Sequence, residues 1–249
     1  MTVYAPAGRV GVIDLSTCVS LIPEFRLALP PELLVLYSRL RLPGGEVTVE
    51  ALDEMVSGTR LEDAARELAD GEVAAITFAC TSGSLLHGPG FDEELRERIT
   101  GATGLPATTT ATSVVAALRH LGAESVSVGT PYIEAIDERE KVFLEDAGFT
   151  VPKIVGLGKH WDREIGALSA DEVRGLARAA FASGSDALFL SCTNLPALHL
   201  VAELEEELGV PVVTSNSATI WQLLRIADLE QELDPSMGRL LAGRRVAVP

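Results

Sequence analysis

The chain has 249 residues, 47% of them hydrophobic and 22% charged, a balance that excludes a disordered or low-complexity protein. Its formal net charge of −16 argues against partners that need a basic face, namely nucleic acids and anionic membranes. No signal peptide or membrane span is predicted, and three widely spaced cysteines without a Cys-x-x-Cys pair predict free thiols. A cytoplasmic protein is therefore expected.

The first half of the chain alternates short apolar runs with longer helical patterns. We predict buried strands at residues 9–14, 73–79 and 106–109. The helical patterns cover residues 49–69 (with a break near Gly58), 91–99 and 113–121.

The second half repeats this alternation. Strands are predicted at residues 125–129, 151–155, 187–191 and 211–214, and helices at residues 133–147, 169–183, 198–208 and 218–227. Ser169 and Glu172 form the capping-box pattern at the start of one of these helices. Strands that alternate with helices predict an α/β fold with parallel sheets covered on both faces. No glycine-rich phosphate-binding loop follows a strand, so a nucleotide cofactor is not supported.

An internal repeat is the most informative feature of the sequence. Residues 75–87 (AITFACTSGSLLH) and 187–199 (ALFLSCTNLPALH) each have an apolar strand, then Cys-Thr, then Leu-His at the same distance. Residues 104–114 and 209–219 repeat a Gly-x-Pro strand that ends in hydroxyl residues. We therefore expect two similar α/β units. Cys80 and Cys192 then lie just beyond strand ends, where open α/β sheets bind ligands.

The residues around these cysteines suggest chemistry. A free cysteine is most often a small buried hydrophobe, but both thiols here precede a run of hydrogen-bond donors. Amides at a helix start hold a carboxylate and lower a thiol pKa, so we expect at least one thiol pKa below about 8.5. Two thiols in facing units reach opposite faces of a small ligand, one as base or nucleophile and the other as acid.

The motifs resemble those of the aspartate/glutamate racemase superfamily. Cys80-Thr81 and the run from Ser191 to Leu198 are similar to its two cysteine motifs, and residues 10–14 are similar to its first strand. Thr130-Pro131-Tyr132-Ile133 and residues 104–110 resemble the branch that contains arylmalonate decarboxylase and maleate cis–trans isomerase.

The resemblance implies two flavodoxin-like domains related by a pseudo-twofold repeat, with the active site in the cleft between them. We place residues 1–112 with 219–249 in the first domain and residues 113–218 in the second. No metal or organic cofactor is implied, the partner is a small carboxylate substrate, and the branch often forms homo-oligomers. The implied catalytic residues are Cys80 and Cys192, and the implied substrate-binding residues are Asp14, Ser16, Thr81, Ser82, Tyr132, Thr193 and Asn194.

Departures from the family patterns separate the candidate activities. Arylmalonate decarboxylases have glycine at the position of Cys80, so two thiols count against decarboxylation. Maleate isomerases have asparagine about where Cys18 lies, and glutamate racemases have histidine where Asn194 lies. Cys18 is interpreted equally as a site-lining thiol and as a packing residue.

We expect a cofactor-independent two-cysteine isomerase of a small carboxylic acid, resembling maleate isomerase or an amino- or hydroxy-acid racemase. One alternative is an arylmalonate-type decarboxylase in which Cys192 donates the proton. The other is a carboxylate-binding protein without catalytic activity. Cysteines at both repeat positions favour catalysis over simple binding.

Overall fold

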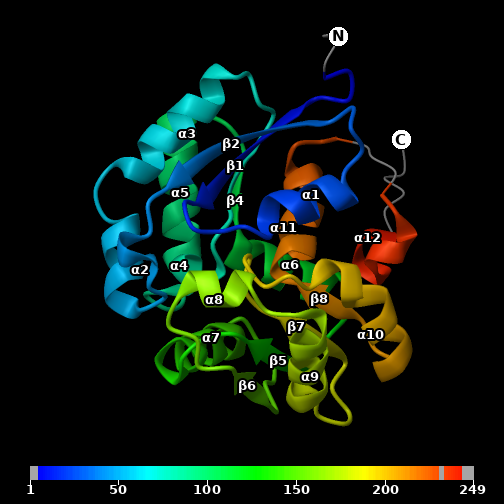
Figure 1. Ribbon diagram of the computed structural model, residues 1–249. Helices are drawn as coiled ribbons and strands as arrows, with labels where there is room; N and C mark the ends of the chain where they lie inside the picture. Colours follow the sequence, from blue (N-terminus) through cyan, green and yellow to red (C-terminus); the bar gives the residue numbers. More distant parts are fainter. Residues whose placement is uncertain (1–4, 230–232, 243–249) are drawn as a thin grey trace.

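The chain forms two sheets, one in each half of the molecule (Figure 1). All strand pairs in both are parallel, and the two sheets have the same strand order. The computed structural model describes residues 5–229 and 233–242. The first sheet has the order β2-β1-β3-β4, and the second has the order β6-β5-β7-β8. The expected α/β fold with parallel sheets and the repeat are therefore confirmed. The strands are β1 (Arg9–Leu15), β2 (Leu34–Leu40), β3 (Ile76–Phe78), β4 (Ala107–Thr109), β5 (Val126–Thr130), β6 (Ile154–Gly156), β7 (Ala187–Leu190) and β8 (Val212–Thr214).

Helices cover both faces of each sheet. In the first half these are α1 (Leu21–Ala28), α2 (Val49–Val56), α3 (Arg60–Asp70), α4 (Thr81–Leu85), α5 (Phe91–Thr103) and α6 (Thr110–His120). The others are α7 (Glu134–Asp146), α8 (Asp162–Gly166), α9 (Ala170–Ala180), α10 (Val201–Leu208), α11 (Ser215–Ile226) and α12 (Arg239–Ala242), with short 3-10 turns at Pro43–Gly45, Leu198–Leu200 and Pro235–Met237. In Figure 1, α3 and α5 cover one face of the first sheet, and α1 and α11 lie on the other.

Equivalent glycines bring one helix close to each sheet. A Cβ on Gly11 in β1 would lie 3.2 Å from atoms of Leu68, which belongs to α3. A Cβ on Gly129 in β5 would lie 3.2 Å from Leu176 in α9. Because these contacts are tighter than ordinary van der Waals distances, a side chain at either glycine would push the helix outward. The two halves thus have the same close helix–sheet contact at an equivalent glycine, as well as the same strand order.

Two central helices join the halves. α6 and α11 pack against each other, and the hydroxyls of Thr110 and Thr219 lie 3.1 Å apart across this contact. Each helix is capped by the last residue of the preceding strand: Thr109 accepts the Thr112 N–H, and Thr214 accepts the Ser217 N–H. The helices therefore start at the strand ends, where the sequence predicted short loops. The domain limits at 112/113 and 218/219 stay a prediction.

The sequence analysis missed one strand completely. β2 is an edge strand that pairs with β1 only, and most of its residues are half-buried. Its pattern (LVLYSRL) follows Pro30 and Pro31 and is neither continuously apolar nor strictly alternating. The predicted break at Gly58 is confirmed, since Gly58 has φ +71° between α2 and α3. The capping box of Ser169 and Glu172 at the start of α9 is also confirmed.

Candidate active site

Cys80 lies between β3 and α4, where it caps the helix. The Gly83 N–H donates to its Sγ over 3.3 Å, and the Ser82 hydroxyl lies 3.9 Å from the same sulfur. A Cβ on Gly83 would approach this Sγ to 2.9 Å. Because glycine has no Cβ, the helix backbone at Gly83 can approach the thiol closely, and the Gly83 N–H can donate to its sulfur.

Cys192 occupies the equivalent place after β7 but has a different backbone. Its φ is +99°, a conformation that L-residues rarely adopt. The Asn194 N–H donates to its Sγ over 3.4 Å, and its own N–H donates to the Ser215 hydroxyl over 2.9 Å. A non-glycine residue in this conformation persists only when its surroundings hold it, and here α11 supplies one of the contacts.

Ser215 links the two cysteine segments. Its hydroxyl accepts the Cys192 N–H and lies 2.8 Å from the hydroxyl of Thr81, the residue that follows Cys80. Cys80 raises the pKa of Cys192, and both thiols raise the pKa of Tyr132, so these three groups lie close enough to interact. The Tyr132 hydroxyl hydrogen-bonds the Cys192 thiol and lowers its pKa. The structure thus brings together Cys80, Thr81, Cys192 and Tyr132.

Burial dominates the titration of both thiols. Cys80 is 2% exposed and Cys192 is 6% exposed. Burial raises the pKa of Cys80 to about 12, although the Gly83 N–H lowers it, and burial raises the pKa of Cys192 well above its usual range. The expected thiol pKa below 8.5 is therefore not found, because burial raises the pKa of both thiols more than the helix-start amides lower it.

The carboxyl end of β1 carries Asp14, which is fully buried. Neither of its carboxyl oxygens has a hydrogen-bond partner among the described residues, and Arg39 Nη2 lies 3.6 Å away. Burial raises the pKa of Asp14 to about 7, against the opposing charge of Arg39. The nearby Cys18 is also buried, and its Sγ lies 3.7 Å from the Thr193 carbonyl.

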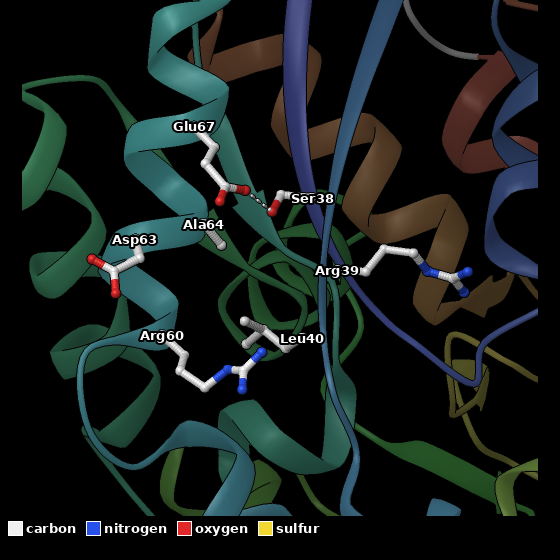
Figure 2. Close-up of a pocket in the computed structure, with 7 residues that line it drawn as sticks. All are labelled: Ser38, Arg39, Leu40, Arg60, Asp63, Ala64 and Glu67. Atoms are coloured by element: carbon white, nitrogen blue, oxygen red, sulfur yellow. Dashed lines mark hydrogen bonds between the residues drawn. The ribbon is translucent and has the colours of Figure 1, made fainter.

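Arg39 positions the loop after β1. Its guanidinium donates to the carbonyls of Leu15 (3.0 Å) and Cys18 (2.5 Å). Figure 2 shows a cavity between β2 and α3 in which Ser38 and Leu40 project toward α3, whereas Arg39 projects from the opposite side of the strand. This cavity is lined by none of the predicted site residues.

Three polar residues clamp the two halves beside the thiols. Thr17 donates to the carboxylate of Asp162 over 2.5 Å, and the Asn194 amide donates to the Asp162 carbonyl over 2.9 Å. The Asn194 side-chain oxygen accepts the N–H groups of Val19 and Ser20. The side chain of Asn194, predicted to bind substrate, is therefore engaged in holding the loop, and its backbone N–H faces Cys192.

The other predicted residues have distinct environments. Ser82 and Thr193 are buried, and the Thr193 carbonyl accepts the Asn216 amide over 2.9 Å. Ser16 is exposed and its hydroxyl accepts the Leu42 N–H over 3.3 Å. It lines a surface hollow of about 310 Å³ together with Thr17, Arg41, Leu42, Gly44, Gly45 and Arg163.

Several buried polar residues escaped the sequence analysis. Asp162 directly follows no predicted strand. Glu24 lies in α1, where no helix was predicted, and Glu140 lies in a predicted helix, where glutamate usually faces solvent. Glu24 accepts the Leu198 N–H and the Asn216 amide, which ties α1 to the Cys192 side. Among these residues, Ser215 could have been found from the sequence, because it lies in the repeated segment that begins with Gly-x-Pro and ends in hydroxyl residues.

Within residues 5–229 and 233–242, no group of three or more His, Cys, Asp or Glu residues could hold a metal ion. In the same ranges, no helix combines the length and the apolar character that a membrane crossing needs.

Known proteins are similar to this chain in sequence and fold. Residues 20–241 match the family model described as arylmalonate decarboxylase. The arylmalonate decarboxylase of Bordetella bronchiseptica is 34% identical over 88% of this chain and 91% of its own.

Two solved structures share the fold. A liganded arylmalonate decarboxylase, mutated from glycine to cysteine and from cysteine to serine, is 31% identical, with a TM-score of 0.88 over 95% of this chain and 100% of its own. A Nocardia farcinica maleate cis–trans isomerase, a cysteine-to-serine mutant with a covalently bound succinylcysteine intermediate, is 27% identical, with a TM-score of 0.88 over 96% of this chain and 99% of its own. The chain therefore belongs to the arylmalonate decarboxylase and maleate isomerase family of the aspartate/glutamate racemase superfamily.

Proposed function

We propose that the protein is a cofactor-independent isomerase that acts on a small carboxylic acid with two thiols, Cys80 and Cys192. The observation that carries this proposal is the pair itself: two thiols follow equivalent strands, Cys80 raises the pKa of Cys192, and both raise the pKa of Tyr132. A binding protein has no need for two such thiols. The succinylcysteine intermediate of the related maleate isomerase supports a covalent role for one cysteine.

In the cis–trans reaction, Cys80 acts as the nucleophile. Its thiolate adds to an alkene carbon, a carbon–sulfur bond forms, and the π electrons move toward the adjacent carboxylate. The former double bond is now single and rotates. Expulsion of the thiolate restores the double bond in the trans acid, while Cys192 handles the proton at the neighbouring carbon. In a racemase version, one thiol removes the α-proton and the other returns a proton from the opposite face.

The groups around the thiols suit a carboxylate. Thr81, Ser82 and Thr193 supply hydroxyls and backbone amides beside the two sulfurs, and Tyr132 supplies a phenol. Such fixed donors stabilise the enolate-like charge of the intermediate. Asp14 would then lie at the edge of the site, where its negative charge raises the pKa of Cys18 and of Cys80.

The second candidate is decarboxylation of a malonate-type acid, with Cys192 as the proton donor. The match to the arylmalonate decarboxylase family model and the 34% identity to the Bordetella enzyme favour it. The cysteine at position 80 favours the isomerase instead, since the related decarboxylase was given a cysteine in place of a glycine only by mutation.

A substrate screen in deuterium oxide separates these activities. Maleate, amino acids, hydantoins and aryl malonates are incubated with the protein and followed by proton NMR. Conversion of maleate to fumarate, or deuterium exchange at an α-carbon, supports the isomerase or the racemase. Loss of carbon dioxide from an aryl malonate without isomerisation of any other acid supports the decarboxylase. Binding without turnover of any compound would contradict both.

A further inference from the structure

A second buried carboxyl lies on the Cys192 side and has no role in the chemistry above. Glu140 in α7 is 1% exposed, and neither of its carboxyl oxygens has a hydrogen-bond partner among the described residues. The Ser191 hydroxyl, next to Cys192, is fully buried and also lacks a partner there. Buried polar atoms without partners are rare and costly, so this pair requires an explanation.

Within the described residues, no positive charge forms an ion pair with Glu140: its neighbours Arg139 and Lys141 bond the Ala135 carbonyl and Glu145 instead. α7 packs against α4 and β6, whose residues (TSGSL and IVG) include no ionisable side chain. The titratable groups that face Glu140 are Asp137 on its own helix and Tyr132, which in turn contacts Cys192 and lies near Cys80. No lysine or arginine of the described chain forms an ion pair with Glu140. An ionised carboxylate here would be buried without compensation.

We propose that Glu140 is a positioning residue for Cys192: a neutral carboxyl that hydrogen-bonds the Ser191 hydroxyl, anchors the turn that holds Cys192, and keeps negative charge away from the contact between Tyr132 and Cys192. This inference rests on the proposed role of Cys192 as a reactive thiol. Because the φ of Cys192 is +99°, its turn needs support on both sides. Ser215 accepts the Cys192 N–H over 2.9 Å on one side. On the other side, Ser191 lies close enough to lower the pKa of Glu140, and the proposed hydrogen bond between these two side chains would hold the residue before Cys192.

The proposal has a pH consequence with a defined sign. Burial raises the pKa of Glu140 to about 8, and the Ser191 hydroxyl opposes that rise. Below pH 8 the group is neutral. Above pH 8 it ionises, and its charge raises the pKa of Tyr132, which weakens the phenol as a donor to the Cys192 sulfur. Formation of the Cys192 thiolate is then opposed at alkaline pH.

Alkylation of Cys192 tests this consequence without any substrate. The rate of labelling by iodoacetamide is measured from pH 6.5 to 9.5, and mass spectrometry separates Cys192 from Cys18 and Cys80. E140Q should match the wild-type protein at pH 6.5, because the amide is neutral and keeps the hydrogen bond. At pH 9 it should label roughly threefold faster, the effect of about half a pKa unit.

Two further variants separate charge from anchoring. E140L removes the charge and the hydrogen bond, so its turn loosens and Cys192 should label faster than in E140Q at every pH. S191A removes the hydroxyl that lowers the pKa of Glu140, so Glu140 ionises at higher pH. The slowing of Cys192 labelling relative to E140Q should therefore begin at higher pH than in the wild type. The matched control is E205Q: Glu205 is a buried carboxyl in α10 whose oxygens accept the Val212 and Arg239 N–H groups. Its labelling profile should follow the wild type.

Each result decides the proposal. Superimposable profiles of E140Q and the wild type would overturn the charge effect, and equal rates for E140L and E140Q would overturn the anchoring. If circular dichroism shows that E140Q does not fold, S191A is compared directly with the wild type: the pH at which the rise of Cys192 labelling weakens should be higher in S191A, because Ser191 lowers the pKa of Glu140. A failed substrate screen leaves these labelling results intact, and an unchanged labelling profile overturns the role of Glu140 while the proposed reaction stands.

Discussion

Cys80 and Cys192 follow equivalent strands, yet the chain leaves them along different paths. Cys80 has an extended backbone, with φ −147°, and α4 begins at the next residue. Cys192 has φ +99° and is followed by a turn and a short 3-10 helix, Leu198–Leu200. The shared Cys-Thr sequence therefore specifies the place of the thiol but not the conformation around it.

The support of each thiol differs in the same way. The Cys80 sulfur accepts an N–H from its own helix, three residues ahead. The Cys192 sulfur also accepts a local N–H, from Asn194, but its turn depends on distant segments as well: Ser215 from α11, Tyr132 from the β5 side, and Val19, whose N–H donates to the Asn194 side-chain oxygen. The Cys80 sulfur is held by local structure and the Cys192 sulfur by local and tertiary contacts together, so the two should respond differently to mutation.

The largest expected effect is on turnover. If both thiols are needed, C80S and C192S should each lose at least about 10³-fold in kcat, because a hydroxyl is a far weaker acid and nucleophile at neutral pH. The double variant should be little worse, since residues that act as a unit are not additive. Steady-state kinetics on the substrate found in the screen provide the measurement.

C80A distinguishes the two proposed reactions. In a decarboxylase only Cys192 must deliver a proton, so C80A should keep much of its activity. In the isomerase it should be nearly inactive while remaining folded by circular dichroism. A C80S variant with a large share of wild-type turnover would remove Cys80 from the mechanism and leave the decarboxylase as the better proposal.

Asp14 and Tyr132 occupy equivalent positions, three residues after the packing glycines Gly11 and Gly129. The first half thus places a buried acid where the second places a phenol. The folded-state pKa of Asp14, about 7, lies above its ordinary value, so the carboxyl opposes folding once it ionises. D14N should therefore gain stability over the wild type as pH rises from 4 to 7, by on the order of 3 kcal/mol.

Urea unfolding at several pH values measures this difference. Asp186 is the control of opposite sign: it is exposed, and the N–H groups of Ser125 and Glu124 lower its pKa. D186N should lose stability at neutral pH, and the deficit should shrink as pH falls through the folded pKa. A D14N curve parallel to the wild-type curve would mean that Asp14 is solvated or paired in the folded protein.

The features that recur in the two repeats could be predicted from the sequence. Both cysteine segments, most strands and the parallel α/β organisation could be predicted, because short apolar runs before Cys-Thr are a local signal. β2 was missed because an edge strand needs less apolar surface than a central one. Asp162, Glu24 and Glu140 were missed because their burial arises from contacts between distant segments, which residue spacing along a helix does not encode.

A smaller effect concerns the backbone at the two cysteines. Glycine adopts positive φ without the cost that a Cβ imposes, roughly 1 kcal/mol. C192G should therefore be more stable than C192A by about 1 kcal/mol. At Cys80 the same comparison should give a difference near zero, because glycine is a better helix cap than alanine but loses more chain entropy. Equal differences at both positions would contradict the unequal support of the two thiols.

The smallest expected effect concerns two arginines, one from each half. Arg41 and Arg163 line the same surface hollow as Ser16, and neither forms an ion pair within the described residues. In a protein with net charge −16, they supply local positive charge for an approaching carboxylate. R41Q and R163Q should each raise KM about two- to fivefold without lowering kcat, since exposed charges contribute little individually.

The dependence of KM on ionic strength provides a second test of the two arginines. Added salt screens exposed charges, so the wild-type KM should rise toward that of the variants as ionic strength increases. R96Q is the matched control, because Arg96 is an arginine of α5 that pairs with Glu93 and does not line the hollow. Its KM should follow the wild type at every ionic strength. If R41Q and R163Q behave like R96Q, the anionic substrate reaches the thiols by a route that neither arginine influences.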